Sequence, residues 1–375
     1  MAPEDSEVVL RVEGLKAFYT SSSGLVRAVN NITFEIHKGE SVGLFGESSA
    51  GKTTVALTIL GLFEDLSRRY ASIAANEDSK RLWELRDSAR KRGLTSEQIG
   101  QELPGIEGHI WFRGVDLLSL NEKDYRQIRG NKITYVPQGS TQSLNPYSNI
   151  EEQTAESLWA HDIDNKLNEY IVMKKVLQAL DLVELGDVDL RKTMKPSQFS
   201  VGEDQRVLIA MALIPDPVLM IADEPTTAVD MVIQQRILEA IQIVRTEMHL
   251  SMLIISNNQG TISQTCDKVA VMTAGHIMEF GTTAIVMNSP GHPFTRAFVM
   301  SNPTMQVIRK IKEKKLRIRG IPGKPPNLAE PIIGCPFKER CEYAMDICRE
   351  QKPKYREVEP GHWIMCHRYE ELPAW

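Results

Sequence analysis

The sequence has no run of about eighteen consecutive apolar residues, the length that a membrane-spanning helix needs. It also lacks the basic-then-apolar start of a secretory signal, because it begins MAPEDSEVVL. Neither sign of charge dominates: the net charge is −5, which gives no reason to expect nucleic-acid binding. A chain of this kind that acts at a membrane must dock on other subunits.

Ordinary globular composition fills the rest of the chain. Of its 375 residues, 42% are hydrophobic and 25% are charged. This length suits about two domains and a sizeable core. We found no internal repeat and no low-complexity segment. Composition therefore favours a soluble, cytoplasmic protein with a packed core.

Residues 46–54, GESSAGKTT, have the pattern Gly-x4-Gly-Lys-Thr of a phosphate-binding loop. An apolar strand-like run precedes the loop and a helix-like run follows it, which is the context that such a loop requires. Its backbone N–H groups would point at the phosphates, Lys52 would add a charge, and the Thr53 hydroxyl would hold Mg²⁺. The predicted nucleotide-binding residues are Gly46, Glu47, Ser48, Ser49, Ala50, Gly51, Lys52, Thr53 and Thr54.

An apolar run from Val218 to Ala222 ends in two carboxylates, Asp223 and Glu224. A buried parallel strand has this pattern, and its carboxyl end is where an open α/β sheet binds ligands. Asp223 would reach Mg²⁺ through water, and Glu224 would polarise an attacking water. With the loop at 46–54, this run makes hydrolysis of a nucleoside triphosphate the leading chemistry.

Four further segments follow in a recognisable order and spacing. They are Gln138 after Ile133–Val136, Phe199–Arg206, Pro225–Asp230 and Leu253–Asn258. With the two segments above, the chain resembles the ATP-binding-cassette (ABC) ATPases over roughly residues 7–300. The resemblance implies an α/β P-loop fold with a mixed-sheet core, an antiparallel β subdomain and an α-helical subdomain.

The resemblance also assigns roles. Catalysis would involve Glu224, Gln138 and Asn257, and Mg²⁺ would be held through Thr53, Gln138 and Asp223. Asp230 corresponds to the D-loop, and the signature that contacts the partner's ATP is Ser200, Val201, Gly202 and Glu203. Tyr19 lies where the family stacks an aromatic ring on adenine, although it could equally be a packing residue.

The C-terminal quarter resembles the ATPase subunits of di- and oligopeptide importers, in the segments His292–Thr295 and Gly320–Pro326 and in a tail with four cysteines. This implies a peripheral protein at the cytoplasmic face of the membrane. Its partners would be a second ABC ATPase subunit, two transmembrane permease subunits and, indirectly, an external solute-binding protein. We expect a nucleotide-binding domain over 1–300, with a helical subdomain near 139–200, and a C-terminal domain over 301–375.

The cysteines divide into a group of four and a single residue. Cys335, Cys341, Cys348 and Cys366 lie in the tail, without the paired Cys-x-x-Cys knuckles usual for zinc. Four thiolates suit a [4Fe–4S] cluster, and similar tails in peptide-importer ATPases are associated with one. Zinc, disulfides and empty thiols remain alternatives. Cys266 is expected to be a small buried apolar residue.

The chain departs from the family pattern at two places that matter for hydrolysis. Asn257 takes the position of the switch histidine, and an amide cannot carry the histidine's proton or charge. In the signature, Val201 replaces a glycine and Glu203 replaces glutamine, which restricts the backbone and places a carboxylate near phosphate. In the loop at 46–54, Ser49 and Ala50 replace the more usual Gly-Ser, a milder change.

These departures suggest one half of an asymmetric heterodimer, which binds ATP well and hydrolyses it slowly at its own site. One alternative is a regulatory cassette that binds ATP without hydrolysing it. Another is a soluble ABC protein without transmembrane partners, but the chain has neither tandem cassettes nor a long coiled-coil insertion.

Two charged segments remain. Residues 64–105 are longer than expected at this position, with a weak helical apolar pattern at Leu82, Leu85 and Ala89. We interpret them as a solvated helical insertion, the alternative being a partner-docking element. Residues 309–319 are strongly basic, and a solvated linker is favoured there over contact with phospholipid headgroups.

Overall fold

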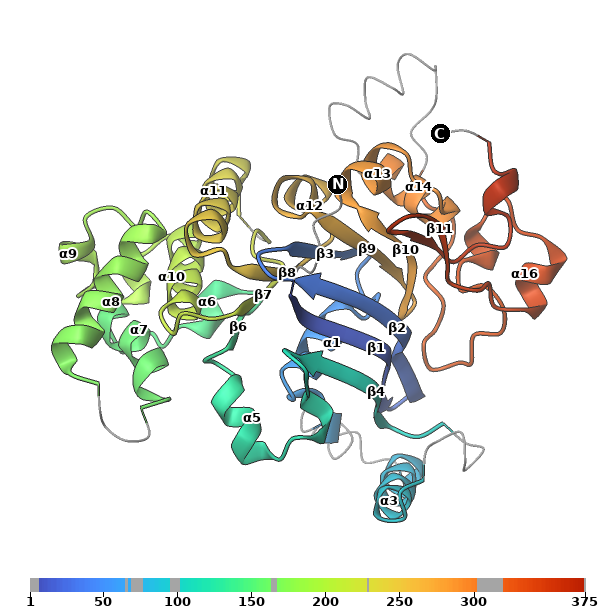
Figure 1. The fold of residues 1–375 in the computed structure, drawn as a ribbon, viewed down its shortest axis with the longest axis horizontal. Coiled ribbons are helices and arrows are strands. Elements are labelled where there is room, and N and C mark those ends of the chain that lie inside the picture. The colour runs from blue at the N-terminus through green and yellow to red at the C-terminus, as the bar shows by residue number, and fades with distance from the viewer. Residues whose placement is uncertain are drawn as a thin grey trace.

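The computed structural model describes residues 7–64, 67–68, 77–94, 102–162, 167–227, 229–301 and 320–373 (Figure 1). Its strands are β1 Val8–Ser21, β2 Gly24–His37, β3 Ser41–Gly46, β4 Gly105–Phe112, β5 Val115–Asp116, β6 Ile133–Val136, β7 Leu219–Asp223, β8 Ser251–Ser256, β9 Lys268–Thr273, β10 His276–Thr282, β11 Arg356–Glu359 and β12 His362–Ile364. Its α-helices are α1 Lys52–Ile59, α3 Glu77–Lys91, α5 Glu122–Ile128, α6 Ser140–Ser143, α7 Ile150–Trp159, α8 Glu169–Leu182, α9 Val188–Arg191, α10 Val201–Leu213, α11 Met231–Met248, α12 Gln259–Thr265, α13 Thr283–Asn288, α14 Pro293–Ser301 and α16 Asp346–Glu350.

The described strands form two sheets. The larger, of eight strands, has the order β11-β12-β10-β9-β3-β8-β7-β6, and its members from β9 to β6 run parallel. Strands β3, β7 and β8 are buried at every position, as expected for parallel strands covered on both faces. The sequence prediction of an apolar strand ending at Asp223 is confirmed.

The smaller sheet, with the order β2-β1-β4-β5, is antiparallel. Its buried face packs with α1 and the main sheet in one cluster that contains Leu15, Phe34, Val55, Ile110 and Leu253. Helix α1 begins at Lys52, after the loop that follows β3, and contacts strands of both sheets (Figure 1). This packing fixes the helix N-terminus at the edge of the main sheet.

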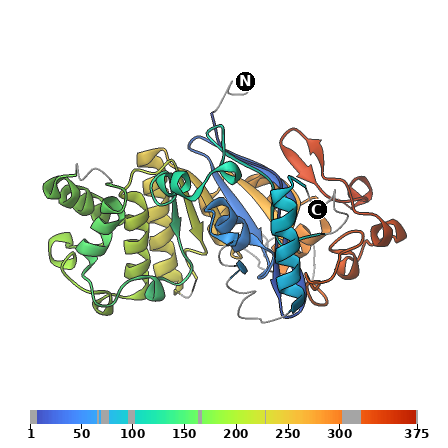
Figure 2. The same ribbon diagram turned by 90° about the horizontal axis from the view of Figure 1, so that it is seen from below.

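Residues 139–200 are mostly helical, as the sequence predicts, and contain α6, α7, α8 and α9. Helix α10 follows and packs against α7 and α8. Asn149 starts α7 with a capping box: its side chain accepts from the Glu152 N–H, and the Glu152 carboxylate accepts from the Asn149 N–H. Figure 2 shows these helices, in green, at one end of the molecule and the C-terminal segment, in red, at the other.

The C-terminal segment is joined to the main sheet. Strand β12 pairs with β10, with Phe280 opposite Trp363, and β11 pairs with β12. The carboxylate of Glu279 on β10 is fully buried and accepts hydrogen bonds from the N–H groups of Gly291 and His292 and from His362 Nε2. The segment is therefore held by a shared sheet and by a buried charge with several donors.

Within the insertion, the structure places the helix α3, but the face that this helix buries differs from the apolar pattern in the sequence. Trp83 of α3 is 6% exposed, and its Nε1 donates to Thr20 Oγ1 of β1 at 3.2 Å. Of the residues in the apolar pattern, Ala89 is buried and Leu85 is exposed. The pattern at Leu82, Leu85 and Ala89 missed the tryptophan, which is the main anchor of α3 on the antiparallel sheet. The basic residues 309–319 lie outside the described residues.

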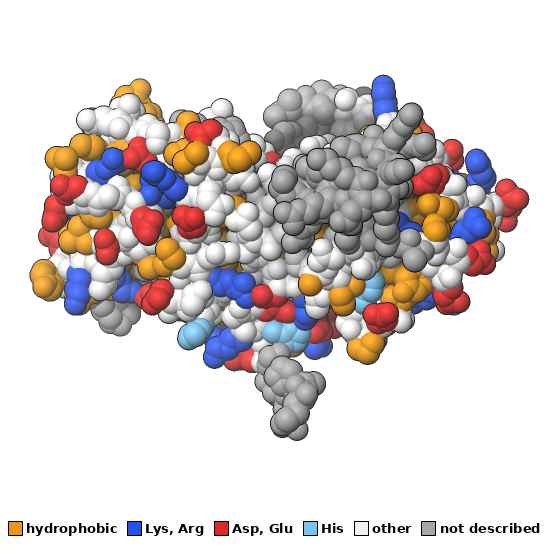
Figure 3. Space-filling view, turned by 90° about the horizontal axis from the view of Figure 1, so that it is seen from above, with side chains coloured by type: hydrophobic (Ala, Val, Ile, Leu, Met, Phe, Trp, Pro, Cys, Tyr) orange, Lys and Arg blue, Asp and Glu red, His pale blue; other side chains and the backbone are white. Residues whose placement is uncertain are grey.

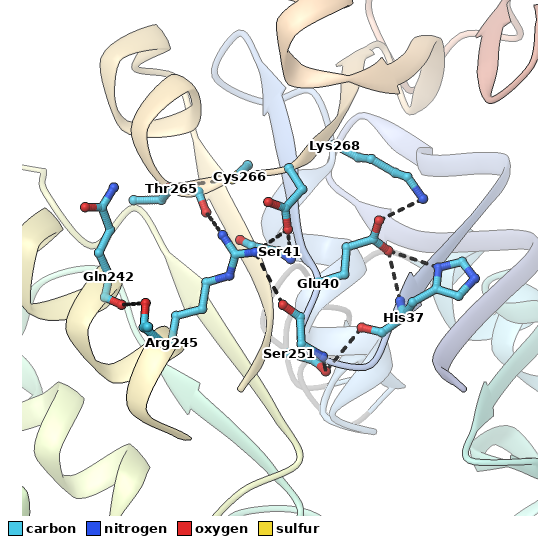
Figure 4. Close-up of polar contacts among 12 residues, drawn as sticks. His37, Glu40, Ser41, Gln242, Arg245, Ser251, Thr265, Cys266 and Lys268 are labelled. Atoms are coloured by element: carbon cyan, nitrogen blue, oxygen red, sulfur yellow. Dashed lines mark hydrogen bonds and ion pairs between the residues drawn. The ribbon is translucent and has the colours of Figure 1, made fainter. Parts of the chain in front are cut away.

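A polar network stabilises the end of the main sheet at which β3, β8 and β9 begin (Figure 4). The Asp267 carboxylate accepts from the Ser41 N–H at 2.9 Å and pairs with Arg245 of α11. Lys268 pairs with Glu40 at 2.7 Å. These contacts fix the start of the strands, and the ends of the same strands carry the chemistry described next. Among the described helices, none is long and apolar enough to cross a membrane.

Candidate functional site

Three neighbouring strands end at the same edge of the main sheet. The register pairs Phe45 of β3 with Ser256 of β8, and Ile255 of β8 with Asp223 of β7. Parallel strands bring their carboxyl ends together, so the loop at 46–54, the carboxylates after β7 and Asn257 emerge side by side. The structure thus gathers segments that lie about 200 residues apart in the chain.

Two glycines let the loop at 46–54 fit against the sheet. A Cβ on Gly46 would lie 2.1 Å from the Met272 carbonyl oxygen, and one on Gly51 would lie 2.1 Å from that of Ala28. Gly51 also has a φ of 98°, which side chains rarely adopt. A glycine is therefore required at both positions for the loop to hold its shape.

Lys52 lies over this loop. Its side chain is 5% exposed, and Nζ donates to the carbonyl oxygens of Gly46 at 2.9 Å and Glu47 at 3.0 Å. Burial lowers the pKa of Lys52, although the carboxylates of Glu224 and Asp223 oppose this effect. The ammonium is thus held at the position where phosphate oxygens would meet the helix N-terminus.

Asp223 offers the features of a magnesium ligand. It is 1% exposed, its Oδ2 accepts from the Tyr135 hydroxyl at 3.2 Å, and its Oδ1 is buried without a hydrogen-bond partner. Burial raises the pKa of this carboxyl, and hydrogen bonds from Thr53 and Tyr135 partly offset the rise. A buried carboxylate oxygen without a protein donor, beside a threonine hydroxyl, fits Mg²⁺ or one of its waters.

Glu224 and Gln138 contact each other although they come from different strands. The Gln138 amide donates to Glu224 Oε2 at 2.9 Å, and the Thr227 hydroxyl donates to the same oxygen at 2.8 Å. Glu224 has a φ of 47°, which lies in the left-handed region of the backbone. This conformation is unfavourable for residues other than glycine and often occurs at functional sites. The Glu224 N–H donates to the Ile255 carbonyl oxygen at 2.8 Å, which holds the backbone of Glu224 against β8.

The two asparagines after β8 have different roles. Asn258 caps α12, because its side chain accepts from the N–H groups of Gly260 at 2.7 Å and Thr261 at 3.3 Å. Asn257 is exposed at the end of β8, two residues beyond the carbonyl that holds Glu224. Asn257 is therefore the residue that the fold presents beside the carboxylates.

The ABC transporter family profile matches residues 29–100 and 94–227, and the profile of the oligopeptide/dipeptide transporter C-terminal region matches residues 278–348. A Sinorhizobium fredii protein named as a probable peptide ABC transporter ATP-binding protein is 33% identical over 98% of this chain and 97% of its own length. The chain belongs to the ABC transporter family.

Further ABC relatives match over the whole chain. The Salmonella typhimurium oligopeptide transport ATP-binding protein OppD is 32% identical over 99% of this chain and 97% of its own. The Caldanaerobacter subterraneus dipeptide transport ATP-binding protein DppD is 30% identical over 97% of this chain and 98% of its own. A dimeric bacterial ABC transporter cassette shares the fold, with a TM-score of 0.56 at 20% identity over 73% of this chain and 98% of that one. The resemblance to ABC ATPases and the expected fold class are confirmed.

The residues predicted to form the ABC signature lie at the start of α10. Ser200 is the N-cap and forms a capping box with Glu203, whose Oε2 accepts from the Ser200 N–H at 2.9 Å and hydroxyl at 2.8 Å. The Glu203 carboxylate is also paired with Arg191, so its charge is neutralised. Val201 is the first residue of α10 and its φ is not positive, so its backbone conformation does not require glycine. Replacing the family's glycine by valine therefore changes only the side chain at this position. A Cβ on Gly202 would lie 2.0 Å from Ile233 of α11, so that position needs glycine for packing.

Asp230 and Tyr19, the other predicted ABC residues, make structural contacts. The Asp230 side chain caps α11 by accepting from the N–H groups of Val232 at 2.9 Å and Ile233 at 3.0 Å. The Tyr19 ring meets Phe63 edge-to-face, with ring centroids 6.3 Å apart. Contact of Asp230 with a partner and of Tyr19 with adenine both stay predictions.

The four tail cysteines line one cavity. All five cysteines are free, and Cys266 is buried as predicted. Within the described ranges, no three His, Cys, Asp or Glu side chains are placed so that they could hold a metal ion. The structure therefore supports neither a disulfide nor a zinc site, and the predicted [4Fe–4S] cluster also has no support from a formed metal-binding group.

Sequence reasoning missed three partners of the site. Tyr135 on Asp223 and Thr227 on Glu224 lie within segments that the motifs had marked, so their spacing could have found them. Arg340, which binds Glu47 in the loop at 46–54, is 293 residues away, and no local pattern signals it.

Proposed function

We propose that this ABC ATPase is the ATP-binding subunit of an importer for peptides or related solutes, acting at the cytoplasmic face of the membrane. The observation that carries the proposal is full-length similarity to proteins named for peptide, dipeptide and oligopeptide transport. The match of residues 278–348 to the oligopeptide/dipeptide transporter C-terminal region supports the same class of cargo. The transport partners would be two transmembrane permease subunits and an external solute-binding protein.

The chain's own ATP would lie on the loop at 46–54. Lys52 would exchange its two carbonyl contacts for phosphate oxygens, and Mg²⁺ would be held by Thr53 and, through water, by Asp223 and Gln138. Glu224 would orient and polarise the attacking water, with Gln138 and Thr227 fixing its carboxylate. Closure of the ATPase dimer on ATP, and its reopening after hydrolysis, would drive the permeases through residues 138–150.

The second ATPase subunit would be a different chain, which makes this protein one half of an asymmetric pair. Asn257 weakens the site on this chain's own loop, and Val201 and Glu203 weaken the site on the partner's loop. At the N-terminus of α11, the apolar residues Met231 and Val232 are 84% and 64% exposed, which favours a protein contact there. The pairing of Glu203 with Arg191 reduces its repulsion of phosphate, so the signature would still contact the partner's ATP.

Co-purification tests the assembly. The tagged chain, extracted from its own membranes in mild detergent, is expected to bring down two permease subunits and one different ABC ATPase in equal amounts, identified by mass spectrometry. Recovery of the permeases with two copies of this chain would contradict the heterodimer and leave the importer intact. Recovery without any membrane subunit would contradict the importer. A regulatory cassette, the alternative that Asn257 favours, would co-purify in the same way and differ by showing no hydrolysis at its own site.

We also propose that the four tail thiols hold a [4Fe–4S] cluster. Backbone N–H groups two residues further on donate to three of the sulfurs: Phe337 to Cys335, Tyr343 to Cys341 and Arg368 to Cys366. Such bonds stabilise thiolates bound to iron. Burial raises the pKa of Cys335 to about 12 and that of Cys341 to about 11, so the bare thiols stay protonated and a cluster would displace their protons. The tail also lacks the paired Cys-x-x-Cys knuckles usual for structural zinc, which favours iron–sulfur over zinc.

Iron and labile sulfide report on this cluster directly. Protein purified without oxygen is expected to carry about four irons and four sulfides per chain. Cys341→Ser should lose most of both, because it removes one of four ligands. Cys266→Ser is the matched control and should keep both, since Cys266 lies beside α12 and β3, away from the cavity. Zinc without sulfide, or equal loading of the two variants, would contradict the cluster.

A further inference from the structure

Arg340 connects the cysteine segment to the phosphate-binding loop. Its Nη1 donates to Glu47 Oε2 at 2.8 Å and its Nη2 donates to Glu47 Oε1 at 2.7 Å, a two-pronged pair across 293 residues of chain. Glu47 is the second residue of the loop at 46–54, and Arg340 directly precedes Cys341. The contact therefore joins the loop predicted to bind phosphate to the segment predicted to bind a metal cluster.

The guanidinium has a prepared site. Arg340 is 6% exposed and lies 5.2 Å from the centre of the Phe337 ring and 6.0 Å from that of Phe294. Its Nη2 also donates to Thr273 Oγ1 at 3.1 Å, and the Thr273 hydroxyl donates to Glu47 Oε1. A buried, two-pronged arginine–carboxylate pair with an extra hydroxyl is geometrically specific, and lysine cannot reproduce it.

The carboxylate of Glu47 needs this partner because of where it lies. A negative side chain in a loop that binds polyphosphate repels the phosphates. Lys52 is also close enough to attract the Glu47 carboxylate toward itself. Burial raises the pKa of Glu47, but the hydrogen bonds from Arg340 and Thr273 outweigh it and hold the pKa below its ordinary value. Glu47 is therefore charged at neutral pH, and Arg340 neutralises that charge.

We propose that Arg340 is a positioning residue of the ATP site, which holds Glu47 away from Lys52 and thereby couples the conformation of the cysteine segment to nucleotide binding. The inference rests on the proposed binding of ATP at this loop. Cys335 and Cys341 flank Arg340 closely, and the Cys335 N–H donates to the Cys348 carbonyl at 2.7 Å, so a shift of this segment moves the guanidinium. Coupling of this kind is reciprocal: ATP stabilises the segment as much as the segment stabilises ATP.

Equilibrium titration of the full chain with MgATP tests the electrostatic part. Arg340→Ala is expected to weaken binding about 10-fold, because the released Glu47 carboxylate attracts Lys52 and repels phosphate. Glu47→Gln in the Arg340→Ala background should restore most of the affinity, which a general loss of packing would not allow. Arg349→Ala, an exposed arginine of the same segment that pairs with Glu339 at 3.8 Å, is the control and should bind as the wild type does.

Hydrogen–deuterium exchange tests the reciprocal part. MgATP is expected to slow the exchange of peptides over 335–341 several-fold in the wild type and in Arg349→Ala, and not in Arg340→Ala. Should Arg340→Ala fail to fold, Arg340→Lys keeps the charge without the two-pronged contact, and it should lose the slowed exchange. Wild-type affinity and wild-type slowing in the folded arginine variant would overturn the inference. A wild type without MgATP binding would instead overturn the proposed function.

Discussion

Glu224→Gln is expected to slow ATP hydrolysis at this chain's own site by about 10²–10⁴-fold while the affinity for MgATP changes little. Glutamine keeps the size of the side chain and an oxygen that accepts from Gln138 and Thr227, as Glu224 Oε2 does at 2.9 Å and 2.8 Å. It cannot polarise a water as a carboxylate does. The variant therefore tests the hydrolysis step while leaving the binding of MgATP nearly unchanged.

Single-turnover hydrolysis by the assembled complex is the measurement, because it separates this site from the partner's. Glu239→Gln on α11 is the matched control, since Glu239 is exposed and accepts a hydrogen bond from Gln235 at 3.0 Å. It should hydrolyse ATP at the wild-type rate. A Glu224→Gln variant that keeps this rate would show that another group polarises the water.

Asn257→His is expected to raise hydrolysis at the same site by about 10²–10³-fold, the usual effect of one prepared group that stabilises the transition state. The backbone needed for this gain is in place. Asn257 directly follows β8, whose Ile255 pairs with Asp223, and Asn258 already caps α12. A histidine adds a proton donor that an amide does not supply. The gain should disappear when Glu224→Gln is introduced with it.

Asn257→Gln is the control for Asn257→His, because it lengthens the side chain without changing its chemistry. It should leave the rate within about threefold of the wild type. The rates are measured on the isolated chain and again with the partner ATPase. Brisk turnover by the isolated wild-type chain, with no gain from histidine, would contradict the idea of a weakened site.

Local patterns predicted the parts of the site that are continuous in the chain. The loop at 46–54 needs glycines at two defined positions, and the burial of β7 follows from its apolar run. The common edge of β3, β7 and β8 follows from their being parallel strands. Gln138 and Glu224 could therefore be assigned together, and the structure brings them into contact.

Contacts between distant segments could not be predicted in this way. The docking of α3 depends on Trp83 meeting Thr20, which a search for regular apolar spacing overlooked. The neutralisation of Glu203 depends on Arg191, and the pairing of Glu47 with Arg340 depends on how the tail folds back onto β10. The two ion pairs change the charge of a motif, and the sequence of the motif itself does not indicate them.

Binding of MgATP to the purified full-length chain tests the central claim most directly. We expect saturable binding of one nucleotide, weakened about 100-fold by Lys52→Ala, because the buried ammonium is the main positive charge on the loop at 46–54. Failure of the wild type to bind MgATP, or equal binding by Lys52→Ala, would contradict the account.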